Sequence, residues 1–330
     1  MKCDILAKLV VDARIAKRRV LASLLWMAPG LVFSGYVAVR RAGMAVLYKP
    51  VSLEDGQIHR DICYREGSAD EKHRLDLFLP QGANWPILVF VHGGGLTSGD
   101  KALRVSGADV YGNIGRFYAS QGIGVAVINY RLQPKVTWRE QAEDVAHATL
   151  WVHSHLGIHG GDTTRLFIGG HSAGAHLASR VALDPKYLQK HGLSPSIFSG
   201  AIAVSGAGLD LCDTLTYDLG AKLRHYERRF RWGDPTENWK REASPVACVS
   251  TATGAPPFLI LYAEGDPQPL QRQSQLLHET LQRHAVPSEI VVVPGESHRR
   301  IVLTLSRPDK TAGPAILRFI GGVVRQIRPV

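Results

Sequence analysis

From about residue 74 to the end of the chain, short hydrophobic runs alternate with longer stretches of helical periodicity. Most of these runs are continuous, which is typical of strands in a parallel sheet covered on both faces, because such strands have no side facing water. The predicted strands are 75–79, 87–91, 125–128, 166–168, 201–204, 258–261 and 290–293, and the predicted helices are 138–155, 173–183, 270–284 and 315–325. The pattern therefore predicts an α/β fold with a mostly parallel central sheet and helices on both faces.

One long interval, 209–250, interrupts this alternation. It is rich in charged and aromatic residues and contains no evident core strand. Long connections of this kind inside a compact domain are commonly functional, and lids over active sites are a frequent case. We therefore predict a domain over 46–330 with a small cap or lid at about 209–250.

Positive charge is concentrated at the N-terminus. The formal net charge is +10, from 39 basic and 29 acidic side chains, and residues 1–41 carry eight of the basic and two of the acidic ones. The remaining 31 basic and 27 acidic side chains are nearly balanced. A nucleic-acid partner is therefore not indicated, since binding to nucleic acid requires a basic surface on the folded domain.

Residues 20–39 form an uncharged hydrophobic segment that follows Arg14, Lys17, Arg18 and Arg19. This length and basic flank fit an export signal or a membrane anchor. Pro29-Gly30 at the centre argues against a continuous spanning helix, and two helices that cover the mouth of the site are the alternative. For residues 1–45 three interpretations therefore stay open: a signal peptide, a membrane anchor or cap helices. Membrane contact through 1–41 and export are weighed equally against a cytoplasmic location.

The four cysteines, Cys3, Cys63, Cys212 and Cys248, are widely and irregularly spaced. No C-x-x-C pair is present, so neither a zinc site nor a thioredoxin-type redox centre is predicted. In an exported protein Cys212 and Cys248 could form a disulfide, but two free thiols are the favoured prediction.

The motif Gly170-His171-Ser172-Ala173-Gly174 lies between the predicted strand 166–168 and the predicted helix 173–183. A serine on such a sharp turn has a strained backbone and an exposed Oγ, and its flanking glycines avoid collisions with the neighbouring strand and helix. The amides at the helix start face any negative charge that develops beside this oxygen. The motif predicts Ser172 as a nucleophile.

A second glycine motif, His92-Gly93-Gly94-Gly95, follows the predicted strand 87–91. Consecutive glycines allow backbone amides to turn toward a substrate carbonyl oxygen, which would complete an oxyanion hole. An ordinary glycine-rich turn is the alternative interpretation. The motif lacks the G-K-[ST] ending of a phosphate loop and the G-x-G-x-x-G of a dinucleotide site, so no cofactor is predicted.

A serine nucleophile in this kind of fold is followed along the chain by an acid and then by a histidine. Asp266 lies just past the predicted strand 258–261, and His298 lies just past 290–293. Both positions are at carboxyl ends of strands, the edge where open α/β sheets bind ligands. The alternatives are Glu264 and Asp210 as the acid, His278 and His284 in a predicted helix, and His171 and His176 beside Ser172, which we assign to pocket shaping and packing.

Together these motifs resemble those of the α/β-hydrolases, and in particular the HGGG-type carboxylesterases and lipases related to hormone-sensitive lipase. The resemblance extends over about 75–319. The elbow Gly-His-Ser-Ala-Gly-Ala-His-Leu-Ala resembles formamidases, isoprenylcysteine methylesterases and feruloyl-esterase-like members more than the lipase-like Gly-Asp-Ser-Ala-Gly. The other matching stretches are 92–95, 98–101, 129–132, 141–145, 160–162, 264–267 and His298, although Arg299 and Arg300 stand where the lipase-like branch has glycine and an aromatic residue.

This resemblance implies a serine carboxylesterase that hydrolyses small to medium carboxylic esters without a metal or cofactor. It implies His298 as the general base, Asp266 as the group that orients it, and the amides of Gly93, Gly94 and Ala173 as the oxyanion hole. An arylformamidase-like amide hydrolase and a catalytically silent binding protein on the same fold are the alternatives. The expected partner is a small-molecule ester, and no oligomeric state is predicted.

Overall fold

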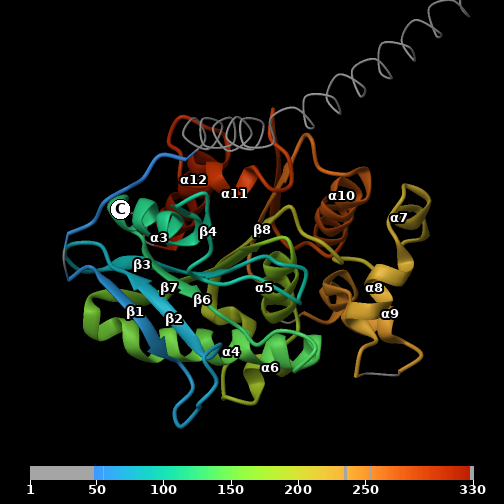
Figure 1. The fold of residues 1–330 in the computed structure, drawn as a ribbon, viewed down its shortest axis with the longest axis horizontal. Helices are drawn as coiled ribbons and strands as arrows, with labels where there is room; N and C mark the ends of the chain where they lie inside the picture. Colours follow the sequence, from blue (N-terminus) through green and yellow to red (C-terminus); the bar gives the residue numbers. More distant parts are fainter. Residues whose placement is uncertain (1–47, 55, 234–235, 253, 328–330) are drawn as a thin grey trace, which may run out of the picture. The chain divides into compact units, whose positions relative to one another are not determined.

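A computed structural model describes residues 48–54, 56–233, 236–252 and 254–327. The chain from Lys49 onward forms one compact unit. An eight-stranded sheet crosses this unit in the order β1-β2-β6-β3-β7-β8-β9-β10 (Figure 1). The strands are β1 (Ile58–Cys63), β2 (Arg74–Phe78), β3 (Trp85–Val91), β6 (Gly124–Ile128), β7 (Gly161–His171), β8 (Phe198–Val204), β9 (Phe258–Ala263) and β10 (Ser288–Val293), with a separate pair β4 (Arg104–Val105) and β5 (Ala108–Asp109).

The sheet is parallel from β6 to β10, and only β2 runs antiparallel to its neighbours β1 and β6. Every residue of β3 and β6 is buried, which explains their continuous hydrophobic sequences. The seven predicted strands are all present, and the predicted mostly parallel α/β fold is confirmed. The carboxyl ends of the parallel strands therefore share one edge of the sheet.

Helices cover both faces of the sheet. Figure 1 shows α3 and α12 on one side, whereas α4 lies on the other side, where it packs against α5. The helices are α3 (Val110–Ser120), α4 (Trp138–His155), α5 (Ala173–Leu183), α6 (Lys186–Gln189), α7 (Thr214–Asp218), α8 (Leu223–Phe230), α9 (Trp239–Ala243), α10 (Gln268–Arg283), α11 (Ile301–Thr304) and α12 (Ala312–Ile327). The predicted bounds of α4 and α5 agree with the structure.

Several elements were not predicted from the sequence, and the two that belong to the main sheet or pack on it are β1 and α3. β1 is an edge strand with a mixed burial pattern and therefore lacks a clear hydrophobic run. α3 contains Gly112 and Gly115, which are poor helix formers. A Cβ on Gly115 would lie 2.2 Å from the Phe78 ring, so close packing of α3 on β2 explains this glycine.

The described part of the interval 209–250 contains α7, α8, α9 and a 3-10 helix that begins at Pro245, and no strand. This agrees with the absence of a core strand in the sequence pattern. α8 packs onto the body of the protein through Tyr226 and Phe230, whose exposed fractions are 8% and 3%. The function of this interval as a lid stays a prediction.

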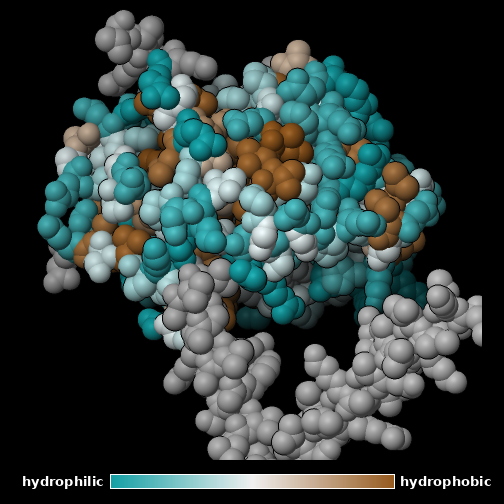
Figure 2. Space-filling view, turned by 90° about the horizontal axis from the view of Figure 1, so that it is seen from above, coloured by the Kyte–Doolittle hydropathy of each residue, from teal (hydrophilic) through white to brown (hydrophobic). Residues whose placement is uncertain are grey.

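The predicted N-terminal segment 1–45 lies outside the described residues, so its separation from 46–330 and its membrane contact also stay predictions. Within the described part of the chain, no helix combines the length and hydrophobicity that a bilayer crossing requires. The face shown in Figure 2 is mainly hydrophilic and carries separate hydrophobic patches.

Candidate active site

Ser172 lies at the sharp turn between β7 and α5. Its backbone angles, φ 57° and ψ −117°, are strained for a residue with a side chain. The flanking glycines make the turn possible, because a Cβ on Gly174 would lie 2.1 Å from the Val91 carbonyl oxygen and a Cβ on Gly170 would lie 2.5 Å from the Gly174 backbone. The predicted strand–serine–helix turn is therefore present in the fold.

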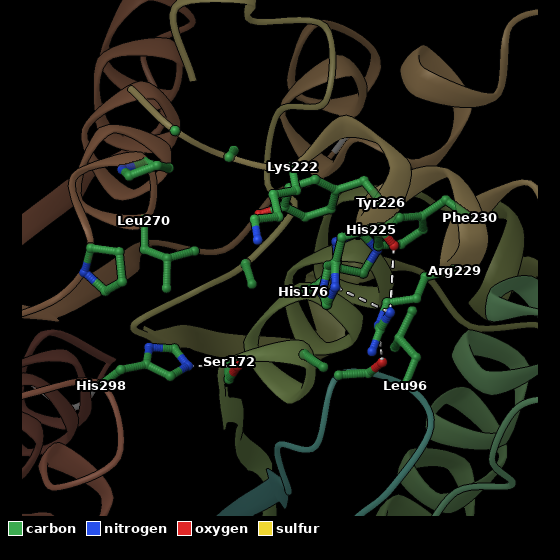
Figure 3. Close-up of a pocket in the computed structure, with 17 residues that line it drawn as sticks. Leu96, Ser172, His176, Lys222, His225, Tyr226, Arg229, Phe230, Leu270 and His298 are labelled. Atoms are coloured by element: carbon green, nitrogen blue, oxygen red, sulfur yellow. Dashed lines mark hydrogen bonds between the residues drawn. The ribbon is translucent and has the colours of Figure 1, made fainter. Parts of the chain in front are cut away.

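The three predicted triad residues meet at the carboxyl edge of the sheet. His298 Nε2 is 2.9 Å from Ser172 Oγ, and His298 Nδ1 is 2.9 Å from Asp266 Oδ1. Asp266 follows β9 and His298 follows β10, whereas Ser172 follows β7. Figure 3 shows the His298 ring directed at Ser172. This arrangement can take a proton from the serine while the carboxylate fixes the orientation of the imidazole.

The Asp266 carboxylate is buried, and hydrogen bonds from neighbouring groups of the protein satisfy both of its oxygens. Its Oδ2 accepts hydrogen bonds from Ser205 Oγ at 2.7 Å and from the Ala263 amide at 3.0 Å. Burial raises the pKa of Asp266, but the hydrogen bonds from His298 and Ser205 outweigh it and leave the pKa below its ordinary value. Ser205 was not predicted as a site residue, although it directly follows the predicted strand 201–204.

The alternative acids and bases have other partners. Glu264 accepts a hydrogen bond from the Gly295 amide at 2.9 Å, and Asp210 accepts one from the Cys212 amide at 2.9 Å. His278 contacts Ser288, and His284 caps the end of α10. Within the described part of the chain, none of these four side chains hydrogen bonds to Ser172 or His298.

Both histidines beside the serine are buried and have structural contacts. His171 Nε2 donates to the backbone carbonyl of His298 at 2.8 Å, and His176 Nδ1 donates to the Gly208 carbonyl at 3.0 Å. Burial lowers the pKa of each ring to about 3, helped by the nearby charge of His298 and of Arg180 respectively. Both rings are therefore neutral at physiological pH, and His171 fixes the loop that carries His298.

The structure corrects the prediction for Gly93. Its amide donates to the Tyr111 hydroxyl at 2.9 Å, so it is already occupied. The amides of Gly94 and Gly95, by contrast, donate to no described residue, and the amide of Ala173 lacks an acceptor in its own helix because Ala173 begins α5. The absence of a side chain at Gly93 leaves room for the His171 ring, because a Cβ at this position would lie 2.9 Å from His171 Nδ1.

Ser172 and His298 open into a cavity of about 340 Å³ (Figure 3). Its walls are the glycine loop after β3, one face of α8 and the start of α10. The described wall residues are mainly apolar or basic, and none of those described is acidic. The apolar side chains include Leu96, Ala207, Tyr226, Phe230, Pro267 and Leu270, and the basic ones are His176, Lys222, His225 and Arg229 in addition to His298.

No group of three or more histidine, cysteine, aspartate or glutamate side chains in the described ranges could hold a metal ion. Cys212 and Cys248 are both free thiols, as favoured from the sequence.

A sequence profile of the BD-FAE family matches residues 75–281, more than half of the chain. Esterase LipQ of Mycobacterium tuberculosis is 29% identical over 275 residues, which cover 79% of this chain and 61% of that protein. A probable isoprenylcysteine alpha-carbonyl methylesterase of Arabidopsis thaliana is 26% identical over 261 residues, which cover 74% of this chain and 52% of that protein. The chain thus spans between half and two thirds of the length of these two curated relatives.

Solved structures share the fold. Esterase B from Lactobacillus rhamnosis superimposes with a TM-score of 0.67 at 22% identity, covering 91% of this chain and 98% of that one. An esterase from Pyrobaculum calidifontis superimposes with a TM-score of 0.65 at 19% identity, covering 90% of this chain and 92% of that one. At these identities the likeness concerns the fold.

Proposed function

The chain belongs to the BD-FAE family and has the α/β-hydrolase fold, and from this premise we propose that it is a serine carboxylesterase for small to medium carboxylic esters. The observation that carries the proposal is the hydrogen-bonded series Ser172, His298 and Asp266, of which Ser172 and His298 line the cavity. Esterase relatives support the same reaction class.

In the first half of the proposed reaction, Ser172 Oγ attacks the ester carbonyl carbon and transfers its proton to His298 Nε2. The carbonyl oxygen becomes an oxyanion and accepts hydrogen bonds from backbone amides. We assign these amides to Gly94, Gly95 and Ala173, because the Gly93 amide is bound to Tyr111. The C–O bond then breaks, and His298 protonates the departing alkoxide.

In the second half, a water molecule attacks the acyl-serine carbonyl and gives its proton to His298. Collapse of this intermediate releases the carboxylic acid and returns the proton to Ser172. Asp266 stays anionic throughout, because three hydrogen bonds stabilise its charge. It holds His298 Nδ1–H, so that Nε2 faces the serine in its basic form.

Two alternatives differ in what they require. A catalytically silent binding protein would not need the hydrogen-bonded series, which favours an enzyme. An arylformamidase-like amide hydrolase would use the same residues on a different bond.

The proposal is tested with purified protein, p-nitrophenyl butyrate and N-formylkynurenine. Saturable release of p-nitrophenol, faster than cleavage of the formamide, is the expected result. Folded protein that hydrolyses neither compound would contradict a hydrolase function, and a clear preference for the formamide would make the amide hydrolase the better assignment.

A further inference from the structure

One face of α8 forms a wall of the cavity above Ser172. His225, Tyr226, Arg229 and Phe230 lie at helical spacing and share this face, and Lys222, the residue directly before the helix, lines the same cavity. Tyr226 and Phe230 are buried and anchor the helix, and the Phe230 ring packs 4.9 Å from the His176 ring. The other three side chains are basic and line the same cavity as Ser172 (Figure 3).

Arg229 is held in place at both ends. Its backbone carbonyl accepts a hydrogen bond from Gln133 Nε2 at 2.5 Å, and its Nε donates to the Gly95 carbonyl at 2.7 Å. Gln133 is buried and therefore ties α8 firmly to the body of the protein. The guanidinium is thus positioned before any substrate binds. Its Nη1 makes two long contacts with His225, with ring Nδ1 at 3.4 Å and with the backbone carbonyl at 3.5 Å.

No carboxylate of the described ranges forms an ion pair with Arg229 or Lys222, and none lines the cavity. Arg229 is half-buried, and burial together with the neighbouring charge of Arg228 lowers its pKa. A half-buried guanidinium without an anion is costly, because it has lost hydration and gained no counter-charge. An anionic group on the substrate would supply the missing partner.

The position of Arg229 identifies the part of the ester that would carry this anion. In Figure 3, Ser172 lies between His298 on one side and Arg229 with Leu96 on the other. The leaving alcohol must lie on the side of His298, because His298 Nε2 protonates it. An acyl part that lies on the opposite side of Ser172 from the alcohol extends toward Arg229.

We propose that the cavity selects monoesters of dicarboxylic acids, with Arg229 binding the free carboxylate of the acyl part and Lys222 adding positive potential. This inference rests on the proposed esterase function and specifies its substrate class. A planar guanidinium can bind a carboxylate through two parallel hydrogen bonds, which a neutral acyl chain cannot form.

The test compares two esters with the same leaving group, 4-nitrophenyl hydrogen glutarate and 4-nitrophenyl pentanoate. They differ only in a terminal carboxylate against a terminal methyl group. The quantity measured is the ratio of kcat/KM for the glutarate ester to that for the pentanoate ester. This ratio cancels general effects of a substitution on the catalytic residues.

In the wild type we expect the ratio to exceed one and to fall as salt is added, because salt screens the attraction. In Arg229→Gln it should fall by about 10- to 100-fold, as expected for the loss of a charge-assisted hydrogen bond pair. The matched control is Arg228→Gln, which removes the same charge from the next residue, an exposed side chain outside the cavity. Its ratio should stay within about twofold of the wild type.

The inference would be overturned if Arg229→Gln left the ratio unchanged, or if both variants lowered it equally. In either case, hydrolysis of the pentanoate ester would still uphold the esterase function. Hydrolysis of neither ester would overturn both. Should Arg229→Gln not fold, product inhibition of the wild type decides: glutarate should inhibit at lower concentration than pentanoate, and the reverse order would overturn the inference.

Discussion

Three hydrogen bonds converge on the carboxylate of Asp266, from the His298 ring, the Ser205 hydroxyl and the Ala263 amide. Each donor favours the charged form, and together they offset the cost of burying it. Because Ser205 and Ala263 both hold Oδ2, Oδ1 stays directed at the imidazole. At this residue the surrounding hydrogen bonds decide both charge and orientation.

Asp266→Asn should lower kcat/KM for p-nitrophenyl butyrate by a factor of about 10³ to 10⁴, because an amide can favour the wrong imidazole tautomer. Glu264→Gln is the matched control, since Glu264 is exposed and its carboxylate accepts a hydrogen bond from the Gly295 amide. It should change kcat/KM by less than about threefold. Steady-state kinetics on both variants measures these effects. If Glu264→Gln lowered kcat/KM more than Asp266→Asn did, Glu264 would be the acid of the triad.

At the residue scale, strand ends and chain order were sufficient to predict the meeting of Ser172, Asp266 and His298. The direction of the glycine amides was not predictable, because it depends on backbone angles such as the φ of 135° at Gly94. It also depends on Tyr111, which binds the Gly93 amide from a helix that the sequence pattern did not predict. Ser205 gave no signal beyond its place after a strand.

At the scale of elements, α4 supports the cavity through Gln141. Its buried Nε2 donates to the Leu96 carbonyl at 2.8 Å and to the Arg131 carbonyl at 2.8 Å. Leu96 lines the cavity and has a φ of 67°, a strained angle for leucine. The helix therefore fixes the loop that follows the glycine motif.

Gln141→Leu keeps a side chain of similar size but removes this donor from both carbonyls; the Leu96 carbonyl keeps the Gln133 amide, whereas the Arg131 carbonyl loses its bond from Gln141. We expect the free energy of unfolding to fall by about 1–3 kcal/mol, the usual cost of an unsatisfied buried acceptor. Turnover of p-nitrophenyl butyrate should also fall as the Leu96 loop loosens.

The control for Gln141 is Glu143→Gln on the same helix, where an exposed ion pair with Lys190 is lost. Its unfolding free energy should stay within about 0.5 kcal/mol of the wild type. Urea unfolding measures both variants, and equal stability of Gln141→Leu and wild type would contradict the supporting role of α4.

Elements with strong local signals were predictable. α4 begins at a capping box in which Thr137 and Glu140 hydrogen bond reciprocally, and its predicted start agrees with the structure. β1 and α3 were not predictable, because one is a mixed edge strand and the other depends on glycine packing against Phe78. Tertiary contacts, rather than local pattern, determine these two elements.

At the scale of the whole molecule, three buried histidines link stability to pH. Burial lowers the pKa of His92 to about 4 and the pKa values of His171 and His176 to about 3. In the unfolded chain each pKa returns to about 6.5. Unfolding below this value therefore takes up protons that the folded protein does not bind.

The free energy of unfolding should thus be highest above pH 6.5 and fall as the pH decreases. Between pH 5.5 and 4.5 the three rings contribute a slope of about 4 kcal/mol per pH unit, which is about 1.4 kcal/mol for each proton. Urea unfolding at several pH values measures the slope, and His176→Gln should reduce it by about a third. If the free energy of unfolding stayed constant or rose as the pH was lowered from 5.5 to 4.5, these rings would titrate normally in the fold.

The identity of the nucleophile is tested most directly by trapping it. A fluorophosphonate should react once per chain and phosphonylate Ser172 Oγ, because His298 activates this oxygen. Peptide mass spectrometry should place the adduct on Ser172, ester turnover should fall in proportion to labelling, and Ser172→Ala should neither be labelled nor turn over p-nitrophenyl butyrate. An adduct on another residue that abolishes turnover, or full turnover after complete labelling of Ser172, would contradict the proposed mechanism.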